Sequence, residues 1–492
     1  MSDKVQLIAY ADRLGGDLPG LKAALDGPLH GLFGGVHVLP FFRPFDGADA
    51  GFDPEDHTEV DARLGSWDDV AALARDYELT VDVIVNHVSS SFAPFLDWLA
   101  RGEHSAYDGM FLTFAGAFPE GATEADLMRL YRPRPGLPFT PYTVDGTMRL
   151  VWTTFTPQQI DLDVRQAQTR AYLIRVLDRL AEAKATRVRL DAVGYAVKTA
   201  GLTSFMTPET FAFIDEITSW CHDRRLDVLV EVHSSFTQQV QIARRVDRVY
   251  DFALPPLVLH ALTAVDADPL LTWLGLRPAN AVTVLDTHDG IGVIDVAADP
   301  TDASRPGLLT PQQIDTLVET IHENSVGTSR RATGAAASNL DLYQVNCTFY
   351  DALGGDDDRY LTARAIQFWA PGIPQVYYVG LLAGSNDMEL LARSKVGRDV
   401  NRHRYSWAEM HTELQRPVVQ ALARLIRFRN THPAFDGVVE YGGGGSHLVM
   451  TWRFGDELAE LETDLTSSAT LVRWTADGHT RETALADLPD GL

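Results

Sequence analysis

Residues 186–193, TRVRLDAV, form the stretch that decides the fold. This short β-branched segment follows a run with helical spacing at residues 169–184 and contains charged side chains. A strand that comes directly after a helix is typical of a repeating β–α unit. We therefore predict a β-strand here, with Arg189 and Asp191 near its C-terminal end.

Seven more apolar, β-branched segments share this character, and turn or charged residues bound each of them. They lie at residues 5–10, 35–40, 80–87, 226–233, 247–254, 281–289 and 371–380. Several are almost continuously hydrophobic, as expected for parallel strands covered on both faces. Helical spacing separates most of them, most clearly at residues 67–78, 169–184, 208–225 and 417–430. Eight β–α units favour an α/β fold, the closed (β/α)₈ TIM barrel, over an open sheet.

Two segments between predicted strands are too long to hold a single helix, residues 88–185 and 290–370. Each follows the C-terminal end of a strand, where the active sites of barrel enzymes lie. We expect two insertion domains that cover the site, and a small β domain where apolar and polar residues alternate in the tail. The predicted division is barrel at 1–85, 168–290 and 356–435, insertion domain B at 86–167, insertion domain B′ at 291–355 and C-terminal β domain at 436–492.

The composition argues against two classes of partner. A formal net charge of −25 does not provide the positive surface that nucleic acids and anionic membranes require. No apolar run approaches the ~18 residues of a membrane span, and the first residues lack the pattern of a signal peptide. The two cysteines, Cys221 and Cys347, cannot form a disulfide framework. These features predict a cytoplasmic protein.

Acidic side chains lie at the ends of four predicted strands, at residues 82–87 (DVIVNH), 189–191 (RLD), 231–233 (EVH) and 286–289 (DTHD). A buried charge needs a partner or a function. Glycoside chemistry requires two carboxylates that flank the scissile bond. Asp191 and Glu231 end adjacent strands, which favours the close spacing of a retaining enzyme. Asp289 adds a negative charge that suits an oxocarbenium-like transition state.

Other side chains near these acids have predicted supporting roles. Arg189 lies two residues before Asp191 on the same strand face and should keep it ionised and oriented. Three clustered acids force at least one to stay protonated at neutral pH, and we assign that proton to Glu231. His87 and His288 are placed to hydrogen-bond sugar hydroxyls. Because no H-x-H or H-E-x-x-H spacing occurs, we predict no metal ion and no cofactor.

The ordered set of motifs resembles the α-amylase family of retaining glycosidases and transglycosidases. The stretches that carry the resemblance are residues 35–40 (GVHVLP), 82–87, 159–163 (QIDLD), 189–192 (RLDA), 229–232 (LVEV), 288–289 (HD) and 372–378 (GIPQVYY). The resemblance implies that Asp191 is the nucleophile, Glu231 the acid/base and Asp289 the transition-state stabiliser. Residues 193–195, VGY, replace the Lys-His pair of polysaccharide hydrolases, and Thr287 replaces a common Asn. Because of these departures we do not predict the calcium site that is common in amylases, and whether calcium is bound stays open.

Further stretches resemble the sucrose phosphorylase branch of that family. They are residues 39–42 (LPFF), 44–54 (PFDGADAGFDP), 131–139 (YRPRPGLPF), 191–195 (DAVGY), 249–256 (VYDFALPP) and 336–346 (AASNLDLYQVN). This resemblance implies reversible phosphorolysis of sucrose to α-D-glucose 1-phosphate and D-fructose. The reaction would be a double displacement through a β-glucosyl-aspartate intermediate.

The same resemblance implies the residues that bind substrate. Asp49 and Arg398 would bind hydroxyls of the glucose ring. Phe52 and Phe155 would form an apolar platform for the sugar, and Arg134 would bind phosphate. The other predicted substrate-binding residues are His87, Arg189, Tyr195, His233, His288, Asp341, Leu342, Tyr343 and Gln344, the last four in a loop of the acceptor site.

Several alternatives stay open at this point. The substrate could be sucrose 6′-phosphate or glucosylglycerate, the reaction could be hydrolysis of sucrose, and a remote alternative is a non-catalytic amylase-like binding protein. Asp341 would repel a fructose phosphate, and the intact acids argue against loss of catalysis. The expected partners are sucrose, inorganic phosphate, glucose 1-phosphate and fructose, without nucleic acid or membrane. The resemblance also implies a homodimer.

Overall fold

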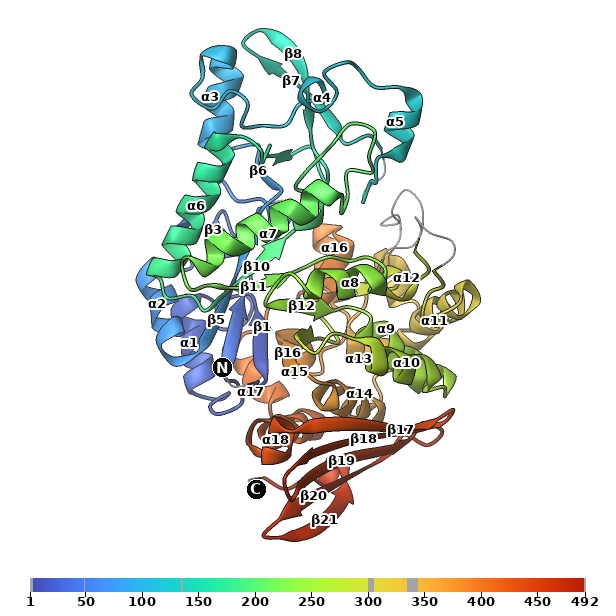
Figure 1. Cartoon of the computed structure of the whole chain (residues 1–492). Helices are drawn as coiled ribbons and strands as arrows, with labels where there is room; N and C mark the ends of the chain where they lie inside the picture. Colours follow the sequence, from blue (N-terminus) through green and yellow to red (C-terminus); the bar gives the residue numbers. More distant parts are fainter. Residues whose placement is uncertain (1–2, 48, 134–135, 300–304, 334–343, 491–492) are drawn as a thin grey trace.

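The computed structural model describes residues 3–47, 49–133, 136–299, 305–333 and 344–490. Eight parallel strands close into a barrel at its centre (Figure 1). Around the barrel they are β1 (Gln6–Ala9), β2 (Gly35–Val38), β5 (Glu78–Ile84), β10 (Arg187–Asp191), β11 (Asp227–Val230), β12 (Arg248–Asp251), β13 (Ala281–Thr283) and β16 (Ile373–Tyr377). Each predicted strand segment overlaps one of them, so the predicted (β/α)₈ barrel is confirmed.

Helices between the strands cover the outside of the barrel (Figure 1). In α6 (Ala167–Glu182) the buried residues recur at helical spacing, from Thr169 and Tyr172 to Leu180, so one face packs inward. The others along the barrel are α1 (Leu18–Asp26), α2 (Trp67–Asp76), α7 (Pro208–His222), α8 (Phe236–Ala243), α9 (Leu254–Ala264), α10 (Asp268–Leu276), α14 (Asp357–Trp369), α15 (Tyr378–Leu381), α16 (Met388–Ser394), α17 (Trp407–Glu413) and α18 (Pro417–Thr431). No helix in the described part of the chain has the length and apolar character of a membrane span.

All eight barrel strands end before the predicted segments do, and two of these early ends carry residues of the site. The segment 80–87 divides after Ile84, and His87 begins β6 (His87–Ser89), which pairs with the antiparallel strand β9 (Gln159–Asp161). The segment 281–289 is a strand only as far as Thr283, and residues 286–289 lie beyond its end. In both cases the polar end of the segment leaves the sheet at the C-terminal side of the barrel, where a site can form.

Two long insertions interrupt the barrel. The first contains α3 (Ala93–Arg101), α4 (Phe114–Ala117), α5 (Glu124–Arg129), β6, β9 and the hairpin β7 (Phe139–Val144) and β8 (Thr147–Trp152). The second contains β14 (Ile291–Gly292), α11 (Pro311–Asn324), α12 (Thr328–Thr333), β15 (Gln344–Val345) and α13 (Phe349–Ala352). A short pair, β3 (Phe42–Arg43) and β4 (Asp56–Val60), follows β2. The domain boundaries drawn from the sequence stay predictions.

A five-stranded antiparallel sheet forms the C-terminal region, and this confirms the predicted β domain. Its strands are β17 (Val438–Gly444), β18 (His447–Phe454), β19 (Glu457–Asp464), β20 (Ala469–Ala476) and β21 (His479–Ala484). Trp452 Nε1 donates a hydrogen bond to the carbonyl of Trp369 at 2.7 Å, and Trp369 Nε1 donates to that of Ala459 at 3.2 Å. The sheet therefore packs on α14, at the opposite end of the molecule from the first insertion (Figure 1).

Candidate active site

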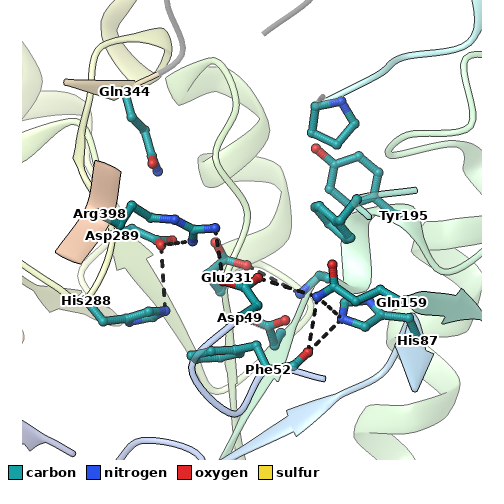
Figure 2. Close-up of a pocket in the computed structure, with 14 residues that line it drawn as sticks. Asp49, Phe52, His87, Gln159, Tyr195, Glu231, His288, Asp289, Gln344 and Arg398 are labelled. Carbon is teal, nitrogen blue, oxygen red and sulfur yellow. Dashed lines mark hydrogen bonds and ion pairs between the residues drawn. The ribbon is translucent and has the colours of Figure 1, made fainter. Parts of the chain in front are cut away.

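A cavity lies at the C-terminal side of the barrel, and the three predicted catalytic acids meet there. Figure 2 shows that side chains from strand ends and from loops point into it. The lining residues are Asp49, Phe52, His87, Pro133, Phe155, Gln159, Asp191, Ala192, Tyr195, Glu231, His288, Asp289, Gln344 and Arg398. Most of the described residues that the sequence predicts for the site are among them.

Asp191 ends β10, and Arg189 points to the same side of this strand. Nη1 of Arg189 donates hydrogen bonds to Oδ1 of Asp191 at 2.9 Å and to Oδ1 of Asp82 at 2.5 Å. Burial alone would raise the pKa of Asp82, but Arg189 and His37 lower it to about 2. Asp82 is therefore ionised at neutral pH and fixes Arg189 beneath Asp191.

Glu231 follows β11, the strand next to β10. Its Oε2 accepts a hydrogen bond from the backbone N–H of Ala192 at 3.4 Å, and its Oε1 lies 3.9 Å from Nη2 of Arg189. Burial raises the pKa of Asp191 well above its usual value; Arg189 opposes this effect, whereas the charge of Glu231 adds to it. The protonation of Asp191 therefore depends on the charges of its neighbours. The assignment of the proton to Glu231 stays a prediction.

Asp289 is the ionised carboxylate on the other side of the cavity. Its Oδ1 accepts a hydrogen bond from Nη1 of Arg398 and lies 3.8 Å from Nη2 of Arg402. Burial alone would raise the pKa of Asp289, but Arg398 and its other neighbours keep it well below the usual range. Nη2 of Arg398 also donates to Oδ1 of Asp49 at 3.2 Å. One guanidinium thus connects two carboxylates in the cavity (Figure 2).

Aromatic rings form two apolar walls of the cavity. Phe52 stacks on His288, with ring centroids 4.6 Å apart and an interplanar angle of 7°. Phe155 contacts His87 and Tyr195 edge to face, each at 5.2 Å. Flat apolar surfaces of this kind suit the faces of a sugar ring.

His87 contacts protein groups through both ring nitrogens. Its Nε2 lies 2.9 Å from the carbonyl oxygen of Phe52 and 3.0 Å from Nε2 of Gln159, while its Nδ1 lies 3.3 Å from Nδ2 of Asn86. Burial lowers the pKa of His87, which keeps the ring neutral. The structure therefore places His87 where it orients Phe52 and Gln159, and its contact with a sugar hydroxyl stays a prediction.

Some predicted residues do not line the cavity. Arg189 lies beneath it, and His233 lies behind Glu231, with its ring stacked on Phe252 at 3.9 Å. Four predicted residues lie outside the described part of the chain: Arg134, Asp341, Leu342 and Tyr343.

Hydrogen-bonded polar side chains fill the barrel interior below the cavity. Tyr250 donates to Oε1 of Gln375 at 3.1 Å, and Nε2 of Gln375 donates to Oε1 of Gln6 at 3.0 Å. His37 lies 2.9 Å from Asp82 and closes the space beneath Arg189. These side chains are almost completely buried, so the cavity ends on a packed floor.

Comparison with known proteins identifies the family. Residues 3–255 match the model of the α-amylase catalytic domain. The chain belongs to the α-amylase family. It is 60% identical to a sucrose phosphorylase of Agrobacterium vitis over 464 residues, which cover 94% of this chain and 95% of the relative. It is 52% identical to a sucrose phosphorylase of Bifidobacterium adolescentis over 99% of both chains. The crystal structure of sucrose 6F-phosphate phosphorylase from Thermoanaerobacter thermosaccharolyticum matches with a TM-score of 0.91 at 36% identity, covering 98% of this chain and 99% of that one.

This α-amylase family member has two polar residues at the site that sequence reasoning did not assign. Gln159 lies in the motif at residues 159–163, but an uncharged amide gives no separate signal. Asp295 lies in the short turn Ile294–Val296 of the second insertion, where no strand or motif marks it. Its Oδ2 lies 2.9 Å from Nδ1 of His233. Only the folded chain shows that this loop carboxylate reaches the site.

Three residues of the site have the spacing of a metal centre. Glu231, His233 and Asp289 offer ligand atoms that lie within 4.8 Å of one another. His233 is already paired with Asp295, and Asp289 with Arg398. Because protein charges engage two of the three groups, we propose no metal there.

A buried ammonium group connects the barrel to the first insertion. Nζ of Lys198 lies 2.5 Å from Oδ1 of Asn86 and 2.5 Å from Oδ2 of Asp161. Asp161 also accepts hydrogen bonds from the N–H and Oγ1 of Thr154, at 2.9 and 2.5 Å. Amide and carboxylate oxygens are typical ligands of hard cations. In this α-amylase family member the cation that they bind is a lysine of the same chain.

Proposed function

We propose that the protein is a glycosyltransferase that catalyses the reversible phosphorolysis of sucrose to α-D-glucose 1-phosphate and D-fructose. The substrate assignment rests on the identity of 60% and 52% to two sucrose phosphorylases over nearly the whole chain. The reaction class is supported by the cavity, which brings two neighbouring carboxyls together with a third, ionised carboxylate.

In the first step Asp191 attacks the anomeric carbon of the glucosyl unit. A bond forms between its Oδ and C1, and the bond from C1 to the fructose oxygen breaks. Glu231 donates a proton to that oxygen, so fructose leaves as a neutral alcohol. Asp289 stays negative and stabilises the positive charge that develops at C1.

In the second step phosphate takes the place of fructose. A phosphate oxygen bonds to C1 from the face that fructose left, and the ester bond to Asp191 breaks. Glu231 accepts the proton that the phosphate hydroxyl loses. Two inversions give net retention, and both carboxyl groups return to their starting states.

Side chains around the acids would bind the glucose ring in place. The linked pair of Asp49 and Arg398 offers acceptors and donors to neighbouring hydroxyls. Phe52 and Phe155 would pack on the sugar faces. On the acceptor side we propose His233 and Gln344, together with Arg134, Tyr195 and the residues at 341–343. The cytoplasmic location and the homodimer stay predictions.

One incubation tests this function. The purified protein is mixed with sucrose with and without inorganic phosphate, and glucose 1-phosphate, glucose and fructose are quantified. We expect phosphate-dependent glucose 1-phosphate in amounts equal to fructose. Equal glucose and fructose regardless of phosphate would show a hydrolase. Turnover of only sucrose 6′-phosphate or glucosylglycerate, offered in parallel, would refute the choice of sucrose.

A further inference from the structure

A fully buried carboxylate lies behind the proposed general acid. Oδ2 of Asp295 lies 2.9 Å from Nδ1 of His233, and its Oδ1 accepts hydrogen bonds from the backbone N–H of Ser234 and from Nε2 of Gln239, both at 3.1 Å. The side chain of Asp295 is 0% exposed. A buried carboxylate needs partners of this kind, and here one of them is a residue of the site.

The surroundings fit the pair of Asp295 and His233 closely. A Cβ on Gly292 would lie 2.4 Å from Oδ2 of Asp295 and 3.2 Å from Nδ1 of His233, so only glycine leaves room for their contact. Phe252 stacks on the imidazole at 3.9 Å, and Tyr250 stacks on Phe252 at 5.0 Å. The plane of the imidazole ring is therefore fixed by packing as well as by its hydrogen bond.

The other nitrogen of the ring faces the reaction site. Nε2 of His233 lies 3.6 Å from Oε1 of Glu231 and 3.5 Å from Nε2 of Gln344. We infer that Asp295 is a positioning residue of the acceptor site, which orients His233 so that Nε2 donates a hydrogen bond to phosphate beside Glu231. This inference rests on the proposed function, because it takes phosphate as the acceptor.

The charges around His233 favour an anionic acceptor. Glu231 follows β11, Asp289 follows β13, and Asp295 lies in the turn Ile294–Val296. Burial alone would lower the pKa of His233, but Asp295, Glu231 and Asp289 raise it to about 9. At neutral pH the ring is an imidazolium, and its Nε2–H forms a stronger hydrogen bond to an anion than to water. In a chain with a net charge of −25, phosphate needs a local cation of this kind.

The main test is Asp295→Asn, which removes the charge and keeps the shape. We expect KM for phosphate to rise roughly 10- to 100-fold, as for loss of a charged hydrogen bond. A larger share of cleaved sucrose should appear as free glucose, while KM for sucrose without phosphate changes less than about threefold. Asp299→Asn is the matched control, because Asp299 lies four residues further on and 3.9 Å from Arg305. It should leave the phosphate KM unchanged.

A second readout needs no substrate. In histidine-labelled protein, NMR titration should show His233 protonated well above neutral pH in the wild type and titrating lower in Asp295→Asn. His233→Gln should reproduce the phosphate defect, and the double variant should be no worse than either single variant. An unchanged phosphate KM in either folded single variant, or an unchanged His233 titration, would overturn the inference. Failure of the wild type to form glucose 1-phosphate would instead refute the proposed function, because the titration is independent of turnover.

Discussion

At the residue scale, Arg189 determines how the acids of the site are charged. It donates hydrogen bonds to Asp82 and Asp191 and lies 3.9 Å from Glu231, yet it is almost completely buried. Its charge lowers the pKa of Asp82, and it also opposes the rise that burial causes in the pKa of Asp191. One buried guanidinium therefore acts on the protonation of both acids.

The proposed role of Glu231 predicts that its substitution slows the reaction of two glucosyl donors to different extents. In Glu231→Gln, kcat/KM for sucrose should fall by about 10³-fold or more, because the fructose oxygen no longer receives a proton. With α-glucosyl fluoride, whose leaving group needs no proton, formation of the glucosyl-enzyme should fall less than about tenfold. Stopped-flow measurement of fluoride release checks this.

Asp191→Asn is the matched control for that experiment. It should lose about 10⁴-fold or more with both donors, because no carboxylate remains to form the covalent intermediate. Equal losses with both donors in Glu231→Gln would contradict the assignment of the proton donor.

The charge of His233 predicts a pH dependence of stability. The pKa of His233 is about 9 in the folded protein and exceeds the ordinary value of 6.5. The contribution of its positive charge to the stability of the fold is therefore complete below pH 6.5 and is lost as the pH rises through about 9. The free energy of unfolding of the wild type, relative to His233→Gln, should therefore fall by up to roughly 3 kcal/mol across that window. Urea unfolding at several pH values measures it, and a constant difference would refute the imidazolium.

Sequence could predict residues at strand ends better than residues in loops. Asp191 and Glu231 could be located because the closing of a barrel brings together the C-terminal ends of its strands. Asp295 could not, because its contact with His233 depends on the path of the second insertion. The assignment of the proton to Glu231 stays a prediction, because it depends on the distances from Arg189 to Asp191 and Glu231, 2.9 and 3.9 Å, which the sequence pattern does not contain.

At the scale of elements, the division between β5 and β6 joins the first insertion to the barrel. His87 pairs with Asp161 of β9, and Lys198 bridges Asn86 and Asp161. The β-branched residues of segment 80–87 predict one strand, because a strand-forming sequence does not reveal where the chain changes its pairing partner. The buried ammonium then orients Asn86, which directly precedes His87 of β6.

Because Lys198 bridges Asn86 and Asp161, we expect the stability of the fold not to depend on divalent cations. Lys198→Met should lower the free energy of unfolding by about 3–5 kcal/mol, because it leaves Asp161 charged and unpaired. EDTA should leave the melting temperature of the wild type unchanged. Lys395→Met, at an exposed position, is the control and should change stability little. A melting temperature that falls in EDTA and recovers with calcium would contradict the role of Lys198.

At the scale of the whole molecule, the C-terminal sheet stabilises the barrel from the end opposite the first insertion (Figure 1). Trp452 and Trp369 are buried where β18 meets α14, and each indole donates a hydrogen bond across the interface. The alternating pattern of the tail predicted the sheet, but not the face on which it packs, since many surface positions on helices are compatible with one apolar strand face.

A substitution at the interface between the C-terminal sheet and α14 should lower stability and leave catalysis unchanged. Trp452→Ala should lower the free energy of unfolding by about 3–5 kcal/mol, through the cavity and the lost hydrogen bond. Its kcat and KM at low temperature should equal those of the wild type. Phe454→Ala, two residues along the same strand but exposed, is the control. A large kinetic change in folded Trp452→Ala would show that the sheet influences the site.

The packed floor of the cavity has a kinetic consequence for the whole reaction. Tyr250, Gln375 and Gln6 fill the barrel interior. In the proposed reaction they would cover the glucosyl unit from below, and both acceptors would approach C1 from the same side. We therefore expect fructose to depart before phosphate arrives, without a ternary complex of sucrose and phosphate. Initial velocities at varied sucrose and phosphate should give parallel reciprocal plots, and fructose should compete directly with phosphate. Intersecting plots would mean that both acceptor molecules fit beside the sugar at once.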